Sequence, residues 1–291
     1  MEYSEVKIGD LPHELNEAIL QAIAMYTVAF LRVESNGEIH RADLLGSGVL
    51  VSTGNSRAIL TAHHVVRELP RVGRLGILLE PTRLPHTVDT RGLAFVEIAR
   101  GADDAIGPDL GAVILAPPIA SAIAAKRNFY NLDLQCKRQL QSPPELRDGA
   151  WFAQGFLEEG TLVTADPEGQ GLRKAFYHFS GVGGPDDSPQ IGDYDYFEFP
   201  VSQAGRPAAP RRWGGMSGGG LWQVPLKREG GQLVHQKPIL SGVVFYQQPT
   251  NESQCGVRCH GRKSVYAVAR DAIRAGSPNP ALEPMAASDP T

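Results

Sequence analysis

From Tyr26 almost to the C terminus, the sequence is a succession of short β-strand patterns. Runs rich in aromatic and β-branched residues are punctuated by turn residues, including the 32 glycines and 22 prolines of the 291-residue chain. Helices are predicted only for the short segments 13–24, 119–127 and 266–274. The chain exceeds the usual size of a single core. The pattern therefore predicts an all-β protein with peripheral helices, built as one large domain or as two packed halves.

One serine, Ser217, lies in an unusually glycine-rich stretch, 214–220. Glycines allow backbone conformations that side chains disfavour, so such a loop can expose a hydroxyl and direct the amides of Gly215 and Ser217 at a developing oxyanion. The alternative is a glycine-rich hairpin whose serine merely occupies a turn. Residues 221–224 follow as a strand pattern, which argues against the nucleophile elbow of an α/β-hydrolase, because that elbow opens a helix.

A histidine and an aspartate occupy comparable positions upstream of this serine. The strand pattern 58–62 runs directly into His63 and His64, and Asp109 immediately precedes the apolar strand pattern 110–115. Each residue alone is as well explained as a satisfied core histidine or a turn aspartate. Together with Ser217 they provide a nucleophile, a base and a carboxylate that orients the base.

Composition argues against several classes of partner. With 28 basic and 32 acidic side chains, the formal net charge of −4 gives no reason to expect nucleic acid or an anionic membrane surface. No apolar run reaches the roughly 20 residues of a membrane span. The acidic start of the chain is unlike a secretory signal.

Cysteine usage predicts a reducing, cytoplasmic compartment. Three cysteines are too few for a disulfide framework in a chain of this length. Cys255, Cys259 and His260 could form half of a zinc site, but the spacing is unusual and no second pair is present, so two free thiols are the preferred interpretation. We expect neither a metal nor a cofactor.

The order of these motifs resembles that of the chymotrypsin/trypsin-like serine peptidases. His64 precedes Asp109 by 45 residues, and Ser217 follows. The resemblance spans most of residues 45–268 and is carried by Gly46-Ser47-Gly48, Leu60-Thr61-Ala62-His63-His64-Val65, Asp109-Leu110-Gly111-Ala112-Val113, Gly215-Met216-Ser217-Gly218-Gly219 and Ser241-Gly242-Val243-Val244.

The resemblance implies two packed antiparallel six-stranded β-barrels with a catalytic triad between them. It places a helical extension at 1–25, the first barrel at 26–116, a crossover linker at 117–148, the second barrel at 149–268, and a C-terminal helix with a disordered tail at 269–291.

The same resemblance assigns roles to individual residues. His64 would be the general base and then the general acid, Asp109 its orienting carboxylate and Ser217 the nucleophile. The amides of Gly215 and Ser217 would form the oxyanion hole. His64 is preferred over His63 because it takes the last place of Thr-Ala-x-His.

The substrate pocket implied by the resemblance is lined by Arg211, Arg212, Val244, Phe245 and Tyr246. An arginine at the base of this pocket would reject basic side chains and could pair with a carboxylate. The alternative is that both arginines turn outward and leave an apolar or small pocket.

Two positions depart from the family pattern. Phe245 stands where relatives commonly carry a serine that contacts the catalytic aspartate. Met216 stands where zymogen-type relatives carry an aspartate that pairs with a new N terminus.

The resulting hypothesis is a serine endopeptidase acting on protein or peptide substrates through an acyl-enzyme on Ser217. By resemblance to stand-alone bacterial proteins of this type, it would be a regulated effector in a stress or defence pathway, with a regulatory protein partner. The alternatives are a catalytically inactive binding module and, less favoured by the residue order, a serine esterase.

Overall fold

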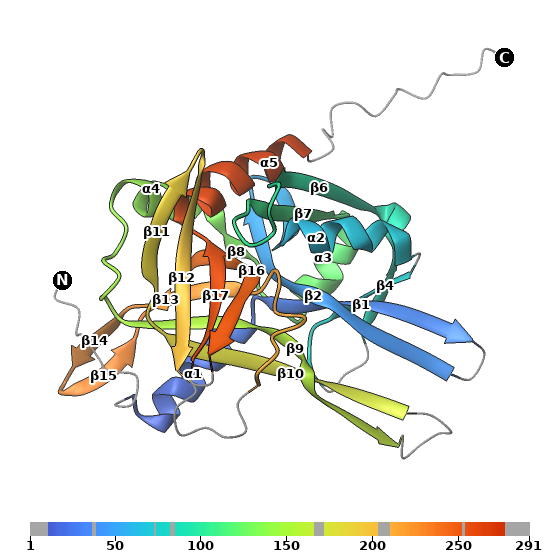
Figure 1. Ribbon diagram of the computed structural model, residues 1–291, viewed down its shortest axis with the longest axis horizontal. Helices are drawn as coiled ribbons and strands as arrows, with labels where there is room; N and C mark the ends of the chain where they lie inside the picture. The colour runs from blue at the N-terminus through green and yellow to red at the C-terminus, as the bar shows by residue number, and fades with distance from the viewer. Residues whose placement is uncertain are drawn as a thin grey trace, which may run out of the picture.

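The computed structural model describes residues 11–36, 39–72, 74–81, 85–165, 172–202, 210–251 and 254–276. Two antiparallel β-sheets form the body of the molecule, the first mainly to the right and the second mainly to the left in Figure 1. The disordered tail predicted after Gly276 lies outside the described residues.

The first sheet is a curled half-barrel in the order β5-β4-β1-β2-β3-β7-β6. Its strands are β1 (Thr27–Asn36), β2 (Ile39–Thr53), β3 (Ser56–Thr61), β4 (Arg74–Leu78), β5 (His86–Asp89), β6 (Leu93–Arg100) and β7 (Asp109–Leu115). A short strand from the crossover segment, β8 (Tyr130–Asn131), pairs parallel to β2. Residues on both faces of β7 are buried, so Asp109 is the first residue of a fully buried strand.

The second sheet closes into a barrel. Its order is β10-β9-β13-β16-β17-β12-β11, and a pairing of Gly183 with Val201 joins β10 to β12, which closes six strands. The strands are β9 (Ala150–Ala165), β10 (Leu172–Gly183), β11 (Asp186–Ile191), β12 (Tyr194–Ser202), β13 (Gly220–Val224), β16 (Ile239–Asn251) and β17 (Gln254–His260). A separate hairpin consists of β14 (Leu226–Glu229) and β15 (Gln232–His235).

The predicted fold class, mainly antiparallel β with two packed barrels, is confirmed. The first barrel differs from the prediction in being open, because β5 and β6 do not pair within the described residues.

Helices lie at the periphery. They are α1 (His13–Ala24), α2 (His63–Glu68), α3 (Pro117–Ala124), α4 (Leu132–Gln141) and α5 (Arg270–Gly276), with 3-10 turns η2 (Leu69–Val72) and η3 (Thr90–Gly92) and a π-helical turn η4 (Ser264–Ala269). The helix predicted over 13–24 has these bounds, that over 119–127 is shifted to α3, and that over 266–274 is divided between η4 and α5. The sequence did not predict α4, whose largely polar residues bury only Leu132 and Gln139.

Apolar residues of the two sheets meet in a large cluster at the joint between them. Phe152 and Trp222 of the second sheet enter this cluster beside Val49 of the first. Ile19 of α1 and Ile273 of α5 belong to it as well, so helices from both ends of the chain cover the joint.

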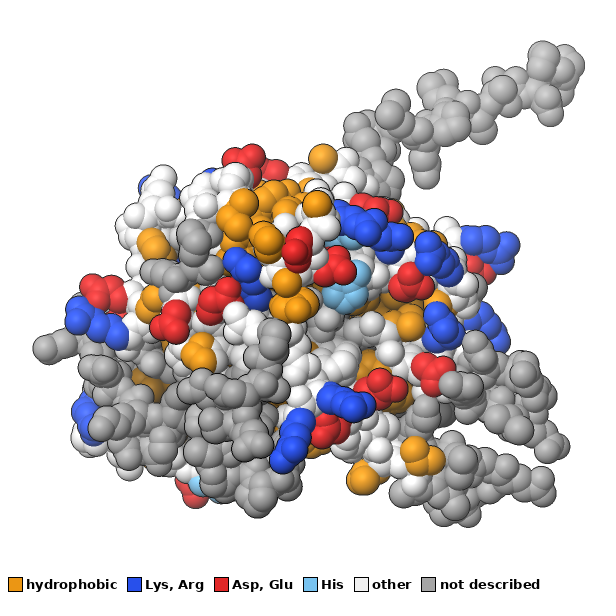
Figure 2. Space-filling view, in the orientation of Figure 1, with side chains coloured by type: hydrophobic (Ala, Val, Ile, Leu, Met, Phe, Trp, Pro, Cys, Tyr) orange, Lys and Arg blue, Asp and Glu red, His pale blue; other side chains and the backbone are white. Residues whose placement is uncertain are grey.

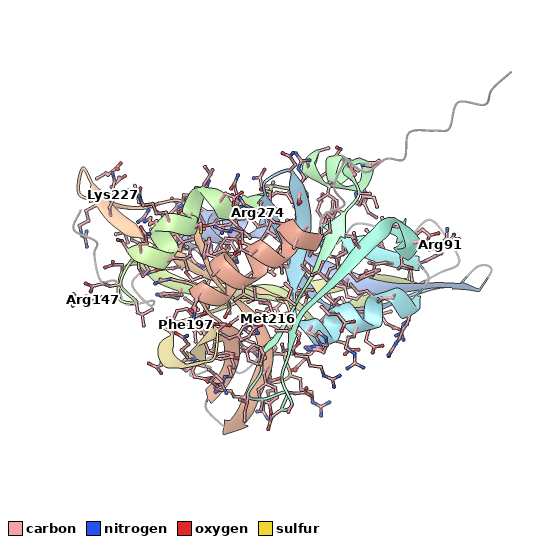
Figure 3. All side chains as sticks on the ribbon, turned by 90° about the horizontal axis from the view of Figure 1, so that it is seen from above. Arg91, Arg147, Phe197, Met216, Lys227 and Arg274 are labelled. Carbon is pink, nitrogen blue, oxygen red and sulfur yellow. The ribbon has the colours of Figure 1, made fainter. Side chains whose placement is uncertain are left out.

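Arg274 fastens α5 to the first sheet. Its Nε donates to Thr53 Oγ1 at 2.8 Å and its NH2 group to Asp133 Oδ1 at 2.7 Å. Figure 3 labels Arg274 on this helix, which crosses the molecule above both sheets. In the described part of the chain, no helix is long and apolar enough to cross a membrane.

Candidate active site

His64 lies in the first turn of α2, which begins two residues after the end of β3. Its Nδ1–H donates to Asp109 Oδ2 at 2.5 Å, and its backbone N–H donates to Asp109 Oδ1 at 2.9 Å. The carboxylate thus fixes both the orientation and the tautomer of the ring, which leaves Nε2 with a free lone pair. The His64 side chain is 50% exposed. Figure 2 shows histidine atoms near the middle of one face, beside acidic and apolar side chains.

The neighbouring His63 has a different partner. Its buried Nε2 lies 2.8 Å from Glu97 Oε2, and the Glu97 side chain is largely exposed. Only His64 of the two histidines therefore contacts Asp109.

Asp109 is the first residue of β7 and is buried. Burial alone raises the pKa of a carboxyl, but the hydrogen bonds and charge of His64 outweigh it, so the pKa of Asp109 lies below its ordinary value. The group is therefore a carboxylate that accepts from His64. The Asp109 backbone N–H donates to His260 Nε2 at 3.0 Å.

Ser217 reaches the first sheet from the loop before β13. Its carbonyl accepts the backbone N–H of Ser47 at 2.8 Å. A Cβ added to Gly46 would lie 2.6 Å from Val65 Cγ2 and 3.1 Å from the Ser217 carbonyl, so Gly46 lets the loop approach α2 beside His64. Ser217 is partly exposed, and within the described residues its hydroxyl makes no hydrogen bond to His64.

The backbone around Ser217 leaves two amides unused. The Gly214 carbonyl accepts from Glu158 N–H at 2.9 Å, and the Met216 carbonyl accepts from Gly219 N–H at 2.8 Å. The N–H of a trans peptide points away from its C=O, so the N–H groups of Gly215 and Ser217 point away from these partners. Neither amide donates to another group in the described part of the chain, as an oxyanion hole requires.

Ser47 anchors this loop and was not predicted to have a role. Its hydroxyl donates to the Gly215 carbonyl at 2.7 Å and accepts the Phe156 N–H at 2.8 Å. Its own carbonyl accepts from the Thr61 hydroxyl at 2.7 Å. Ser47 is fully buried. It therefore connects the loop that carries Gly215 and Ser217 to both sheets.

The residues expected in the substrate pocket are dispersed. The side chains of Arg211 and Arg212 are exposed, and their backbone N–H groups bind the Glu159 carboxylate, at 3.1 Å and 2.5 Å to Oε2. Glu159 thus holds this segment by its backbone and leaves the guanidinium groups outside, the alternative that the sequence left open.

The other expected pocket residues lie on β16. Val244 is buried and binds the serine loop through its backbone, accepting from Gly218 N–H at 2.7 Å. Phe245 is buried against the aspartate loop, where a Cβ on Gly107 would lie 3.1 Å from its ring. Tyr246 is partly exposed.

The cysteine-histidine segment does not form a metal site in the described residues. Cys259 is a buried free thiol, and His260 is engaged with Asp109. No group of three or more histidine, cysteine, aspartate or glutamate side chains with metal-binding geometry occurs in the described ranges.

Comparison with known proteins gives remote structural likeness alone. No family model matches the sequence, and no curated protein matches it. The tobacco vein mottling virus protease is 11% identical, with 82% of this chain and 78% of that chain covered and a TM-score of 0.40. Rv3671c from M. tuberculosis H37Rv, in the inactive form of a mutant, is 13% identical, with 95% and 100% covered and a TM-score of 0.41.

A third structure, from work on the disordered Sesbania mosaic virus VPg protein, is 16% identical, with 92% and 95% covered and a TM-score of 0.43. At such identities and scores, these neighbours do not establish what this chain does.

Proposed function

We propose that this chain is a serine endopeptidase that hydrolyses peptide bonds through an acyl-enzyme on Ser217. The observation that carries the proposal is that the Asp109 carboxylate accepts hydrogen bonds from both Nδ1–H and the backbone N–H of His64. The loop before β13 brings the partly exposed Ser217 close to α2, together with two backbone N–H groups that donate no hydrogen bond within the described residues. A buried carboxylate that orients an imidazole next to such a loop is the arrangement that activates a serine.

Each group then has a defined role. His64 Nε2 takes the proton of the Ser217 hydroxyl as its oxygen attacks the peptide carbonyl, and the amides of Gly215 and Ser217 bind the resulting oxyanion. His64 gives the proton to the leaving amine. His64 then takes a proton from a water molecule, which attacks the acyl-enzyme and releases the carboxylic acid product from Ser217. Asp109 stabilises the transient imidazolium. We expect the contact between the hydroxyl and Nε2 to form with substrate, since catalytic hydrogen bonds often tighten only in the complex.

Covalent labelling tests the nucleophile. A fluorophosphonate probe should add one adduct, which peptide mapping should locate on Ser217. Ser217→Ala should abolish both labelling and peptide hydrolysis, a loss of several orders of magnitude, while the fold remains intact. The control is Ser121→Ala, which removes an exposed hydroxyl on α3 and should leave both unchanged.

The alternatives correspond to distinct outcomes. An inactive binding module would fold but react with no probe. A serine esterase would label at Ser217 and cleave simple acyl esters but no member of a peptide library.

We further propose that the enzyme disfavours cleavage after Lys or Arg. Arg211 and Arg212, rather than an aspartate, occupy the segment expected at the base of the pocket, and the nearby Glu159 carboxylate accepts from their backbone amides. A positional-scanning library in which cleavage after basic residues dominates would contradict this proposal.

The proposal needs no N-terminal processing. Met216, labelled near the middle of Figure 3, is buried in the apolar core of the second barrel and offers no partner to a new ammonium group. Ser47 already holds the Gly215 carbonyl of the loop. Mass spectrometry of active protein should find the chain uncleaved between residues 20 and 45.

A further inference from the structure

A second histidine lies behind the aspartate of the candidate triad. His260, the last residue of β17, is fully buried, and its Nε2 accepts the Asp109 backbone N–H at 3.0 Å. A nitrogen that accepts from an amide carries no proton, so the ring is neutral with its proton on Nδ1. Nδ1 has no hydrogen-bond partner among the described residues. Among the described residues, the only hydrogen bond of the imidazole is thus the one to the backbone of Asp109.

Aromatic side chains fix the plane of this ring. Phe245 lies 4.8 Å away between ring centroids at an interplanar angle of 38°, and Tyr196 lies 5.3 Å away at 35°. Both also line the approach to Asp109, since a Cβ on Gly107 would lie 3.1 Å from Phe245 and 3.3 Å from Tyr196. The ring therefore has little freedom to move away from the Asp109 amide.

We propose that His260 is a positioning residue of the candidate active site, which sets the start of β7 and thereby the direction in which Asp109 holds His64. This inference rests on the proposed function for its kinetic consequences. Its geometric content does not depend on activity.

Charges around His260 are compatible with its neutral state. Burial lowers the pKa of His260 to about 4, against the opposing influence of Asp109 and Asp195, while Arg258 adds to the lowering. The imidazole consequently stays an acceptor throughout the range in which His64 must act as a base.

The first test uses the unaltered protein. Long-range 1H–15N correlation spectra should show His260 as the neutral tautomer with its proton on Nδ1 at neutral pH. A protonated ring, or a proton on Nε2, would overturn the proposal whether or not the protein is active.

The second test removes the acceptor. His260→Phe keeps an aromatic ring but leaves the Asp109 N–H without a partner, so the fluorophosphonate labelling rate of Ser217 should fall about five- to hundredfold. The downfield Nδ1 proton resonance of His64 should shift or disappear. His260→Gln retains an acceptor and should recover part of the rate. The control is His178→Phe, because His178 is another histidine whose pKa is lowered to about 4 by burial, with a buried Nε2 atom but a partly exposed residue.

The outcomes separate the two proposals. If the His64 resonance responds to His260→Phe but the wild type never labels, the proposed function is wrong and the positioning role stands. If His260→Phe keeps both the resonance and a rate within twofold of wild type, the positioning role is wrong. If His178→Phe slows labelling equally and disturbs the resonance equally, the effect belongs to general destabilisation and the proposal fails. Should His260→Phe not fold, the tautomer measurement decides.

Discussion

Replacing Ser47 by alanine tests how the loop that carries Gly215 and Ser217 is held. The substitution deletes a fully buried hydroxyl that links the Gly215 carbonyl, at 2.7 Å, to the Phe156 N–H, at 2.8 Å. It keeps the backbone bond from Ser47 N–H to the Ser217 carbonyl. One partly buried acceptor, the Gly215 carbonyl, and one buried donor lose this partner; a buried group left unsatisfied costs about 1 to 3 kcal/mol, and the partly buried acceptor about 1 kcal/mol. We expect the free energy of unfolding to fall by about 2 to 4 kcal/mol.

The effect on activity follows from the same bond. Gly215 has a φ of 91°, one of several conformations open to glycine, and the hydrogen bond to its carbonyl helps to select it. Removal of one oxyanion donor costs about 10²- to 10³-fold in kcat. An unfastened loop should therefore lose about tenfold or more, mainly in kcat.

Chemical denaturation and the labelling rate of Ser217 measure the two effects. Ser241→Ala is the matched control, because Ser241 is equally buried but its hydroxyl makes only a long contact, 3.5 Å, to the Ile239 carbonyl. If Ser47→Ala resembles Ser241→Ala in both stability and rate, the proposed anchoring is refuted.

Three other changes have defined outcomes. Asp109→Asn should preserve the fold but lower peptide hydrolysis by about three to four orders of magnitude, because an amide does not hold the imidazole in the productive tautomer; a loss below tenfold in steady-state kinetics would count against the triad. Gly218→Ala should abolish activity and destabilise the loop in thermal unfolding, since φ is 89° and the new Cβ would lie 2.0 Å from the Thr61 hydroxyl; a fully active, stable variant would contradict this geometry. Burial lowers the folded-state pKa of His178 and of His260 to about 4, so the unfolded chain binds protons first and stability should fall as pH decreases from 6.5 towards 4, by about 2 kcal/mol per histidine at pH 5. Denaturation curves at pH 7 and pH 5 measure this loss, and each His→Phe variant should lose about half of the pH dependence that the two share.

The candidate site residues that could be predicted are those with a recognisable pattern in the adjacent sequence. Ser217 lies among glycines, His64 follows a buried strand, and Asp109 precedes one. Each signal needs only a few adjacent residues, and the strand patterns likewise predicted the fold class.

Residues that act through distant partners could not be recognised in this way. The bond from Asp109 to His260 spans 151 positions, and the bond from Ser47 to Gly215 spans 168. In the sequence His260 stood out only as the neighbour of Cys259, in a segment that we interpreted as carrying two free thiols, with half of a zinc site as the alternative. The direction of Arg211 depends on Glu159, 52 positions away, which no local pattern indicates.

β17 and α5 follow Ser217 in the sequence, so the candidate site is completed only by segments synthesised after its serine. The first sheet and Ser217 have emerged before residues 254–276 exist, yet β17 completes the barrel around Val257 and carries the imidazole beneath Asp109. The guanidinium group of Arg274 in α5 then donates hydrogen bonds to Thr53 and Asp133. Chains emerge from the ribosome N-terminus first at roughly 5 to 20 residues per second. A chain synthesised only as far as Ser217 therefore carries an incomplete candidate site until residues 254–276 have followed.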